Sequence, residues 1–369
     1  MTQPSIIAAP FAHQGNTVSR AMVLVMVALV PVTLFGLYQF GWPAINLLLV
    51  TVASAMLFEA LCLKLMGKPV SDGLADGSAA LSGWLLALTL PPWAPWWIGT
   101  VGAFLAIVVA KQIFGGLGQN LFNPAMVARV ALLISFPVEM TRWVAPLPLG
   151  SNGAPDFLAG LGITFGLNHG FDAVSSASLL GAFKTQLSTG ASASEALSTT
   201  FGLLDLGLGT VAGSLGETAA GLILAGGLLL LATRIITWHI PVAMLATVAI
   251  FSGGLYLLDS DHFLSPAYHL LSGATLLGAF FIATDYVTSP VTTRGQLLFG
   301  AGIGLLVVVI RTWTGYPEGM AFAVMLMNAC VPLIDRYTRP RVFGRTRTGD
   351  PMEYSAQRLA RASGRKEAE

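Results

Sequence analysis

Long apolar stretches recur along this sequence and predict a set of membrane-spanning helices. A helix crosses the hydrocarbon layer of a bilayer, about 30 Å, with roughly 17 to 25 apolar residues. Stretches of that length begin near residues 21, 43, 95, 122, 215, 239, 293 and 318. Two further apolar segments are shorter or interrupted: residues 78–91 end in Pro91, and residues 265–284 contain Ser, Gly and Thr. Counting both, we predict an all-α polytopic membrane protein of about ten transmembrane segments.

The two interrupted segments occupy matching places, which suggests an internal duplication. Each is third in a set of five, one set within residues 21–140 and the other within residues 213–337. Because five is an odd number of crossings, we expect two inverted five-segment repeats. Few residues align, beginning with Ser-Gly in each interrupted segment. Inverted repeats that are broken at matching places favour a binding site near the membrane midplane.

Basic residues predict the orientation of these segments. With a cytoplasmic N-terminal arm at residues 1–20, every other connection carries Lys or Arg, as cytoplasmic loops do. Residues 141–212 then form an extracytoplasmic insert, periplasmic in a bacterium, and residues 338–369 form a basic cytoplasmic tail in contact with membrane lipid. Arg142, Lys184 and Arg311 are exceptions to the pattern. We expect an uncleaved first span and a location in the bacterial inner membrane.

Composition supports a membrane protein and excludes several site types. The chain of 369 residues is 54% hydrophobic and 10% charged, whereas about a quarter of a soluble domain is charged. A net charge of +1 gives no reason to expect nucleic-acid binding. Cys62 and Cys330 stand alone in apolar runs, without the paired spacing of a zinc or iron–sulfur site. We therefore predict no metal site and interpret both cysteines as packing residues.

The insert contains a short motif that carries the first functional hypothesis. Asp172 is followed by Ser175, Ser176, Ala177 and Ser178, giving D-x-x-S-S-A-S. This motif resembles the D-x-x-[ST]-G-A-T signature, at which a flavin transferase attaches FMN through a phosphoester to the last hydroxyl. That signature marks the RnfD and NqrB family of membrane subunits in ion-translocating electron-transport complexes. Without this likeness, the plain interpretation is a solvated Ser- and Gly-rich loop.

Longer motifs extend the resemblance over nearly the whole chain. They are K-Q-I-F-G-G-L-G-Q-N-L-F-N-P-A-M at 111–126, G-S-L-G-E-T at 213–218, G-A-F-F-I-A-T-D-Y-V-T-S-P-V-T at 278–292 and Y-P-E-G-M-A-F-A-V-M-L-M-N at 316–328. The resemblance implies covalent FMN on Ser178, with Asp172, Ser175, Ser176 and Ala177 as the rest of the attachment site. The attachment residue here is Ser rather than Thr, Ser176 replaces Gly, and Leu179 stands where Pro is common.

A literal S-G-A-T at residues 272–275 is the rival attachment sequence. It lies inside an apolar segment, with His269 where the signature requires Asp. A transferase that acts on extended chain would hardly reach it, so we favour Ser178. Lys184, six residues beyond Ser178, either faces the FMN phosphate or is a lone surface lysine.

A second polar motif lies in the membrane domain. Gly115 and Gly116 permit close backbone approach, and Asn120 and Asn123 provide side-chain donors and acceptors ahead of Pro124. Helix N-termini favour anions, and family relatives hold a second, noncovalent flavin in the membrane domain. We expect riboflavin or FMN near these residues, with Arg129 as a further candidate. A tight interhelical turn is the alternative interpretation.

Charged residues inside apolar segments are the candidates for an ion route. Arg129 lies in an apolar run and needs a partner, because an unpaired charge at membrane depth costs several kcal/mol. The acidic candidates are Glu59, Glu217, Asp285 and Glu318. We predict Glu217, Asp285 and Glu318 as groups that pass Na⁺ or H⁺. The alternative is an ion pair that only holds helices together.

The resemblance implies a flavin-carrying subunit of a complex that passes electrons between ferredoxin and NAD⁺ and moves Na⁺ or H⁺. The expected partners are subunits like RnfA, RnfB, RnfC, RnfE and RnfG, and the chain alone should not turn over. Two other functions remain open. An inverted five-plus-five plan also resembles the architecture of urea channels, which need no flavin, and an NqrB-like subunit of a quinone reductase would have different partners.

Overall fold

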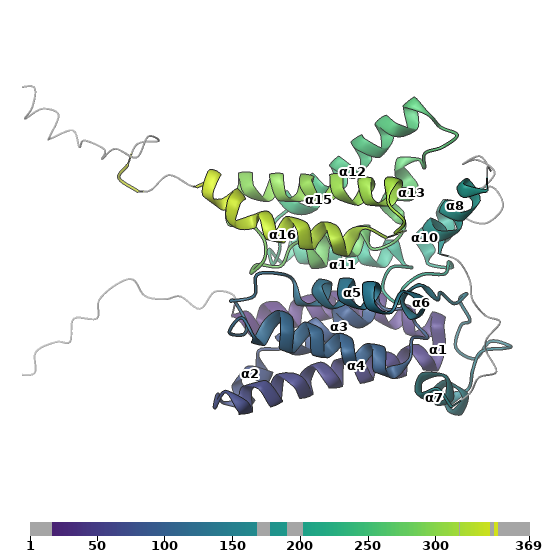
Figure 1. Cartoon of the computed structure of the whole chain (residues 1–369), viewed down its shortest axis with the longest axis horizontal. Helices are drawn as coiled ribbons and strands as arrows, with labels where there is room; N and C mark the ends of the chain where they lie inside the picture. Colours follow the sequence, from purple (N-terminus) through teal and green to yellow (C-terminus); the bar gives the residue numbers. More distant parts are fainter. Residues whose placement is uncertain (1–16, 168–177, 190–201, 317, 340–342, 346–369) are drawn as a thin grey trace, which may run out of the picture.

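The structure is a computed structural model that describes residues 17–167, 178–189, 202–316, 318–339 and 343–345. These residues form helices and contain no β-strand. Figure 1 shows two groups of long helices lying side by side. The first group contains α1 (Val18–Leu65), α3 (Ser78–Thr89), α4 (Trp96–Phe104), η1 (Leu105–Gln112) and α5 (Pro124–Ser135). The second contains α11 (Ala220–Ala232), α12 (His239–Leu258), α13 (Pro266–Leu271), α14 (Thr275–Leu277), η2 (Gly278–Ile282), α15 (Thr293–Trp313) and α16 (Met320–Tyr337).

Several short helices lie at the two ends of the groups. Figure 1 shows α6 (Pro137–Thr141), α7 (Phe157–Phe165), α8 (Leu179–Ser188) and α10 (Leu203–Leu208) together at one end, which we call the insert end. The helix α2 (Val70–Ala75) lies at the opposite end. Among the described residues, α1, α12, α15 and α16 are long and apolar enough to cross a membrane, and shorter apolar helices occupy 78–89, 96–112, 124–135 and 220–232. The expected helical membrane fold is therefore confirmed in its class.

The first two predicted spans are joined within α1 by a break at Gly41. Gly41 has φ +72° and ψ −157°, a backbone conformation that only glycine adopts readily. Ser19 near the start of α1 donates a hydrogen bond to the carbonyl of Ala75, which follows the end of α1 by ten residues. The two arms of α1 must therefore run in opposite directions, with the reversal at Gly41.

The segment at 265–284 is broken, as its sequence predicts. Helix α13 ends at Leu271, the backbone of Ser272 to Ala274 is not helical, and the chain continues as α14 and η2. Gly273 has φ +61°, and a Cβ there would lie 2.0 Å from Glu318 Oε2. The break therefore requires glycine at this position. The other short segment, α3, ends at Thr89 ahead of the two prolines.

The sixth apolar stretch differs from its prediction. The apolar pattern predicts a start near residue 215, but α11 begins at Ala220 and residues 213–219 form a loop. The N–H groups of Leu215 and Gly216 donate to the carbonyls of Leu90 and Leu88. These are carbonyls at the end of α3, where a helix leaves acceptors without intrahelical partners. The loop therefore takes the place of a helical turn because it completes the hydrogen bonding of the other half.

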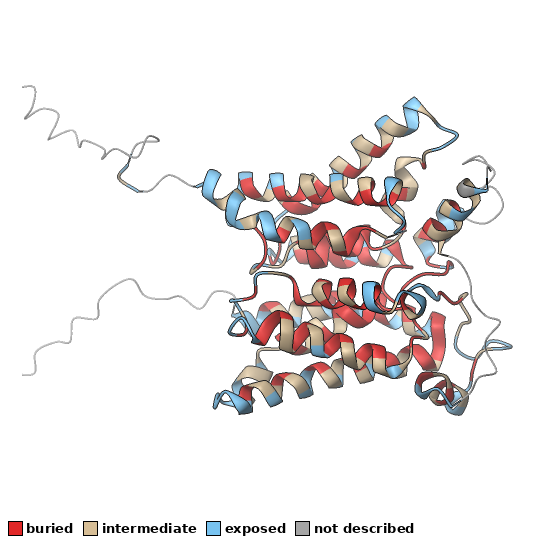
Figure 2. Cartoon of the chain, in the orientation of Figure 1, coloured by how far each residue is buried: buried red, intermediate tan, exposed pale blue. Residues whose placement is uncertain are grey.

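The two groups of helices share one hydrophobic core. Its buried residues come from both groups, including Leu29 and Leu86 from the first and Leu277 and Phe299 from the second. Figure 2 shows buried residues concentrated where the groups face each other and exposed residues on the outer faces. Glycines permit the closest contact: a Cβ on Gly226 of α11 would lie 2.5 Å from the carbonyl oxygen of Ala28 in α1.

A buried ion pair holds three segments of the first group together. Lys111 Nζ of η1 lies 2.8 Å from Glu59 Oε1 in the second arm of α1 and 2.7 Å from Ser78 Oγ at the start of α3. Lys111 and Glu59 are 1% and 2% exposed, so neither charge is solvated by water. Each charge is therefore tolerated because the other is present.

We expect Glu59→Leu and Lys111→Met, made singly, each to destabilise the protein by about 3–5 kcal/mol, because each leaves one buried charge unpaired. The Glu59→Leu/Lys111→Met double variant should lose much less, because no charge remains. Thermal unfolding of the purified complex in detergent measures the three midpoints. A double variant as unstable as the sum of the singles would contradict this account.

Candidate functional site

Ser178 begins a short helix that is docked against the second group of helices. The N–H of Gly181 donates to Ser178 Oγ at 3.3 Å, so Ser178 is the N-cap of α8. Helix α8 buries Leu179, Leu180 and Phe183 in a small apolar cluster with Leu206, Val211 and Leu264. The backbone at Ser178 is therefore fixed by a cap on one side and by packing on the other.

The side chain of Ser178 lines a pocket of about 480 Å³ at the insert end. Trp143, Glu217, Ser272 and Glu318 line the same pocket. Ser178 itself is partly exposed. A serine hydroxyl that accepts one hydrogen bond keeps a second lone pair and its own proton. The oxygen is thus reachable for phosphoester formation, and the group attached to it would lie beside a pocket.

The rival attachment residue, Thr275, lies in a different environment. It is fully buried. Its hydroxyl donates to the carbonyls of His269, at 2.9 Å, and Ser272, at 3.2 Å, and so serves the helix break. A transferase has no access to this oxygen in the folded chain. The signature residues Asp172, Ser175, Ser176 and Ala177 fall outside the described residues.

The helix break beside this pocket is held by a second buried ion pair. Arg311 of α15 lies 3.0 Å from Glu318 Oε2 and donates to the carbonyls of His269 and Ser272. Glu318 also accepts hydrogen bonds from the N–H groups of Ala274 and Met320. The pair thus satisfies backbone donors and acceptors on both sides of the break.

Arg129 points to the insert end rather than to the turn that precedes its helix. It is 5% exposed, lies 3.8 Å from Met140 Sδ and approaches the ring of Trp143 at 6.0 Å. Glu217 and Glu318 act on it electrostatically. No carboxylate of a described residue lies within 4 Å of it. The structure therefore does not group Arg129 with Asn120 and Asn123.

Of the other acidic candidates, Glu59 pairs with Lys111 and Glu318 pairs with Arg311. Asp285 accepts hydrogen bonds from Val287 N–H, at 3.4 Å, and from the Thr288 hydroxyl, at 3.1 Å. Glu217 is 9% exposed and lines the pocket of Ser178. Glu217 and Glu318 therefore share one pocket, while Asp285 lies elsewhere.

Lys184 does not share the pocket of Ser178. Its Nζ donates to the carbonyls of Thr314 at 2.5 Å and Tyr316 at 2.7 Å. These bonds tie α8 to the loop between α15 and α16. Burial, and then the charge of Arg311, lower the pKa of Lys184 from its ordinary value. Of the two interpretations of this lysine, the structure matches neither, because Lys184 is a docking residue.

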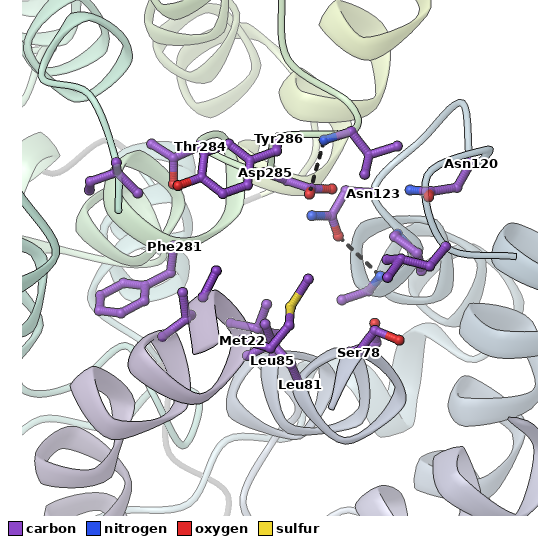
Figure 3. A pocket seen from close by; sticks show the side chains of 18 of the residues that line it. Met22, Ser78, Leu81, Leu85, Asn120, Asn123, Phe281, Thr284, Asp285 and Tyr286 are labelled. Atoms are coloured by element: carbon purple, nitrogen blue, oxygen red, sulfur yellow. Dashed lines mark hydrogen bonds between the residues drawn. The ribbon is translucent and has the colours of Figure 1, made fainter. Parts of the chain in front are cut away.

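A larger pocket, of about 800 Å³ including space open to solvent, lies between the two groups of helices. Figure 3 shows Met22, Leu81 and Leu85 on one side of it and Phe281 and Asp285 on the other. Asn120 and Asn123 line it, together with Ser78 and Lys111 of the first ion pair. Its walls are therefore mostly apolar, with a few polar groups at fixed positions, as in small-molecule sites.

Asn123 is fixed by contacts with both groups of helices. Its Oδ1 accepts hydrogen bonds from the N–H groups of Ala125 and Met126, which makes it the N-cap of α5. Its Nδ2 donates to the carbonyl of Ile282 in η2 at 3.5 Å. Figure 3 shows Asn123 close to Asp285 across the junction. The predicted half-helix start is thus present, and it faces the pocket.

The two glycines of the same motif have another role. Gly115 and Gly116 have φ +116° and +103° and shape the turn that leads from η1 toward α5. Neither lines the pocket, and the Gly115 carbonyl accepts a hydrogen bond from Lys68. For these two residues the interhelical-turn interpretation fits, whereas Asn120 and Asn123 lie at the pocket.

Sequence reasoning misses the roles of Lys111, Ser78 and Arg311. The charge pattern indicates Lys111 only as a topology determinant and leaves Arg311 as an exception at a span end. The usable signal is the position of each cation at the end of the fourth segment of its half, inside an apolar run. Three or more His, Cys, Asp or Glu residues placed to hold a metal do not occur in the described part of the chain.

Comparison with known proteins connects this geometry to one family. A family model described as the NQR2, RnfD, RnfE family matches residues 5–344. A protein of Halorhodospira halophila is 51% identical over 347 residues, which are 94% of this chain and 97% of that protein. Proteins of Stutzerimonas stutzeri (56% over 337 residues; 91% and 95%) and Rhodobacter capsulatus (57% over 304 residues; 82% and 84%) are also similar. All three are named as the D-type component of an ion-translocating oxidoreductase complex.

Proposed function

The chain belongs to the NQR2, RnfD, RnfE family, and we propose that it is the flavin-carrying membrane subunit of an ion-translocating ferredoxin:NAD⁺ oxidoreductase complex. The relatives that cover most of its length are named as subunits of such an ion-translocating complex. The observation that carries the flavin assignment is the reachable Ser178 hydroxyl on a docked helix beside a pocket. An NqrB-like subunit of a quinone reductase belongs to the same family, but these relatives favour the Rnf type. A urea-type channel has no support among them.

Ser178 is proposed to hold FMN as a phosphoester. A bound flavin exchanges one or two electrons and so joins one-electron carriers to hydride chemistry. The protein's own contribution is position. The N-terminus of α8 presents backbone N–H groups to a phosphate on Ser178. The packing of Leu179 and Leu180 limits how far that residue moves. Trp143 gives the adjoining pocket an aromatic wall.

The pocket between the two groups of helices is proposed to hold a second, noncovalent flavin, either riboflavin or FMN. Phe280, Phe281 and Tyr286 line it and offer ring faces on which a flat heterocycle can stack. Asn120 and Asn123 offer amide groups to the polar edge of such a ring. Its volume of about 800 Å³, part of it open to solvent, lies within the range of small-molecule sites.

The acidic residues are proposed to form two stations of a route for Na⁺ or H⁺. Glu217 and Glu318 lie at the pocket of Ser178, and Asp285 lies at the larger pocket. The hydroxyls of Ser214 and Thr218, on either side of Glu217, are buried and make no hydrogen bond. Oxygen atoms are the ligands that hard cations prefer. Glu217 therefore has suitable neighbours for a cation.

The proposed architecture is ten segments in two inverted repeats. The two buried ion pairs support it. Lys111 and Arg311 each lie at the end of the fourth segment of a half, each pairs with a carboxylate, and each bonds to the third segment of its own half. Lys111 adjoins the larger pocket and Arg311 bonds to Ser272 at the Ser178 pocket. The insert end is then periplasmic, both termini are cytoplasmic, and the membrane is the bacterial inner membrane.

The chain is proposed to act within a complex that contains subunits like RnfA, RnfB, RnfC, RnfE and RnfG, and not alone. The described residues offer no cluster for a metal or an iron–sulfur centre, and electrons must reach and leave a bound flavin. Neighbouring subunits therefore have to supply these centres and the NAD⁺ site.

We expect intact-mass measurement of the chain from the native complex to show one FMN adduct, which Ser178→Ala removes and Ser178→Thr retains, because either hydroxyl forms the phosphoester. Thr275→Val is the matched control at the rival sequence and should keep the adduct. An adduct that persists in Ser178→Ala and disappears in Thr275→Val would move the attachment site to the helix break.

We expect the purified complex to release noncovalent flavin on acid precipitation and Ser82→Phe to release less, because a ring at this wall of the larger pocket occupies flavin space. Fluorescence of the supernatant measures the flavin released. The covalent adduct, measured by mass, is the control and should be unchanged. Equal release from both proteins would exclude this pocket.

We expect an impermeant maleimide to label Asp261→Cys, but not Lys68→Cys, in spheroplasts whose chain also carries Cys62→Ser and Cys330→Ser. Asp261 lies in the loop between α12 and α13 at the insert end, and Lys68 follows α1 at the opposite end. Both should react after lysis. Labelling of only Lys68→Cys before lysis would reverse the orientation.

A further inference from the structure

A third pocket lies at the insert end, behind α8, and has no role in the proposed function. It encloses about 650 Å³ between α8, the loop before α13 and the last turn of α15. Lys184 and Arg311 line it, with His262 and His269. Phe183, Phe263 and Trp313 form its aromatic walls. It therefore joins a cationic side to an apolar side.

Buried donor groups in this pocket lack acceptors. Arg311 Nε is buried without a hydrogen-bond partner, and Arg311 is 3% exposed. His269 Nδ1 is likewise buried and unpartnered, and His269 is 5% exposed. An arginine Nε–H donates only. An unmet buried donor costs about 1–3 kcal/mol, so a pocket built this way is incomplete without an acceptor-bearing group.

The positive charges of the pocket are only partly balanced. Glu318 pairs with Arg311, and Asp259 pairs with His262 at 2.8 Å. Lys184 has no carboxylate partner among the described residues, and its two hydrogen bonds to carbonyls leave one of its three protons available. The lowered pKa of Lys184, caused by burial and then by Arg311, agrees with a cation that lacks a nearby anion.

The surroundings of the pocket are those of a membrane–water boundary. Trp313 is 58% exposed at the end of α15, and Leu258 is 83% exposed at the end of α12. The rings of Phe251 and Phe263 lie 6.4 Å from that of Trp313. Tryptophan at the end of an apolar helix is typical of the headgroup region. An amphiphilic ligand can therefore reach the pocket along the bilayer surface.

We propose that this pocket binds a phosphate group, supplied by the headgroup of an anionic phospholipid. Lys184 and Arg311 would donate to the phosphate oxygens, and the rings of Phe263 and Trp313 would pack against the glycerol and acyl carbons. Phosphate in solution carries the same oxygens but makes no use of the apolar walls. The ligand would fix α8 against α15, because Lys184 and Arg311 belong to these two helices. The proposal does not depend on the flavin assignment.

The test compares two substitutions at Thr312, which lines the pocket and for which no hydrogen bond is observed. Thr312→Glu adds a carboxylate, and Thr312→Gln adds the same volume without charge. The intact complex is placed in phosphatidylcholine vesicles containing phosphatidylglycerol with a photoreactive acyl chain. Peptide mass spectrometry then maps the labelled residues. We expect labelling around Phe263 and Trp313 in the wild type and Thr312→Gln, and about tenfold less in Thr312→Glu, because a charge-assisted contact is lost.

A second pair of variants removes charge instead of adding it. Lys184→Gln should reduce the labelling, whereas Lys68→Gln should not, although Lys68 also donates to a backbone carbonyl, at the opposite end. Loss of labelling on addition of inorganic phosphate would support the phosphate site and assign it to phosphate in solution. Equal labelling by photoreactive phosphatidylcholine and phosphatidylglycerol, unchanged in Thr312→Glu and Lys184→Gln, would overturn the proposal.

Discussion

A helix that is broken at membrane depth must find hydrogen-bond partners within the protein, because hydrocarbon offers none. The break at residues 272–274 is completed by one ion pair. Arg311 donates to the carbonyls of His269 and Ser272, and Glu318 accepts from the N–H of Ala274. The charges in turn are tolerated because they neutralise each other. The Ser178 pocket includes Ser272, Gly273 and Glu318, so its shape depends on this arrangement.

The same solution recurs in the first group of helices, where Lys111 joins Glu59 and Ser78. Each ion pair lies next to a pocket, one at the insert end and one facing the opposite group of helices. Polar side chains are costly inside a membrane protein and therefore occur where they complete backbone bonding or form a site. Here the two uses coincide, since a broken segment both needs polar partners and leaves space for a ligand.

The insert is connected to this framework rather than hanging from it. Helix α8 packs its apolar face on the cluster around Leu264, and Lys184 bonds to the carbonyls that follow α15. A residue at the start of α8 is consequently held at a set distance from the membrane helices. For a redox group this matters, because electron transfer requires its partners to stay within reach of one another.

Much of this protein could be predicted from the order of its residues. Apolar length indicated the helices, Ser and Gly in residues 265–284 indicated the break, and Asn123-Pro124 indicated a helix start, because each is a local property of the chain. Tertiary structure alone decided which charges meet. Glu59 and Lys111 are 52 residues apart in the chain, and Arg129 turned toward Trp143 rather than toward the asparagines. Pairing of buried charges depends on how helices pack, and no local pattern encodes that.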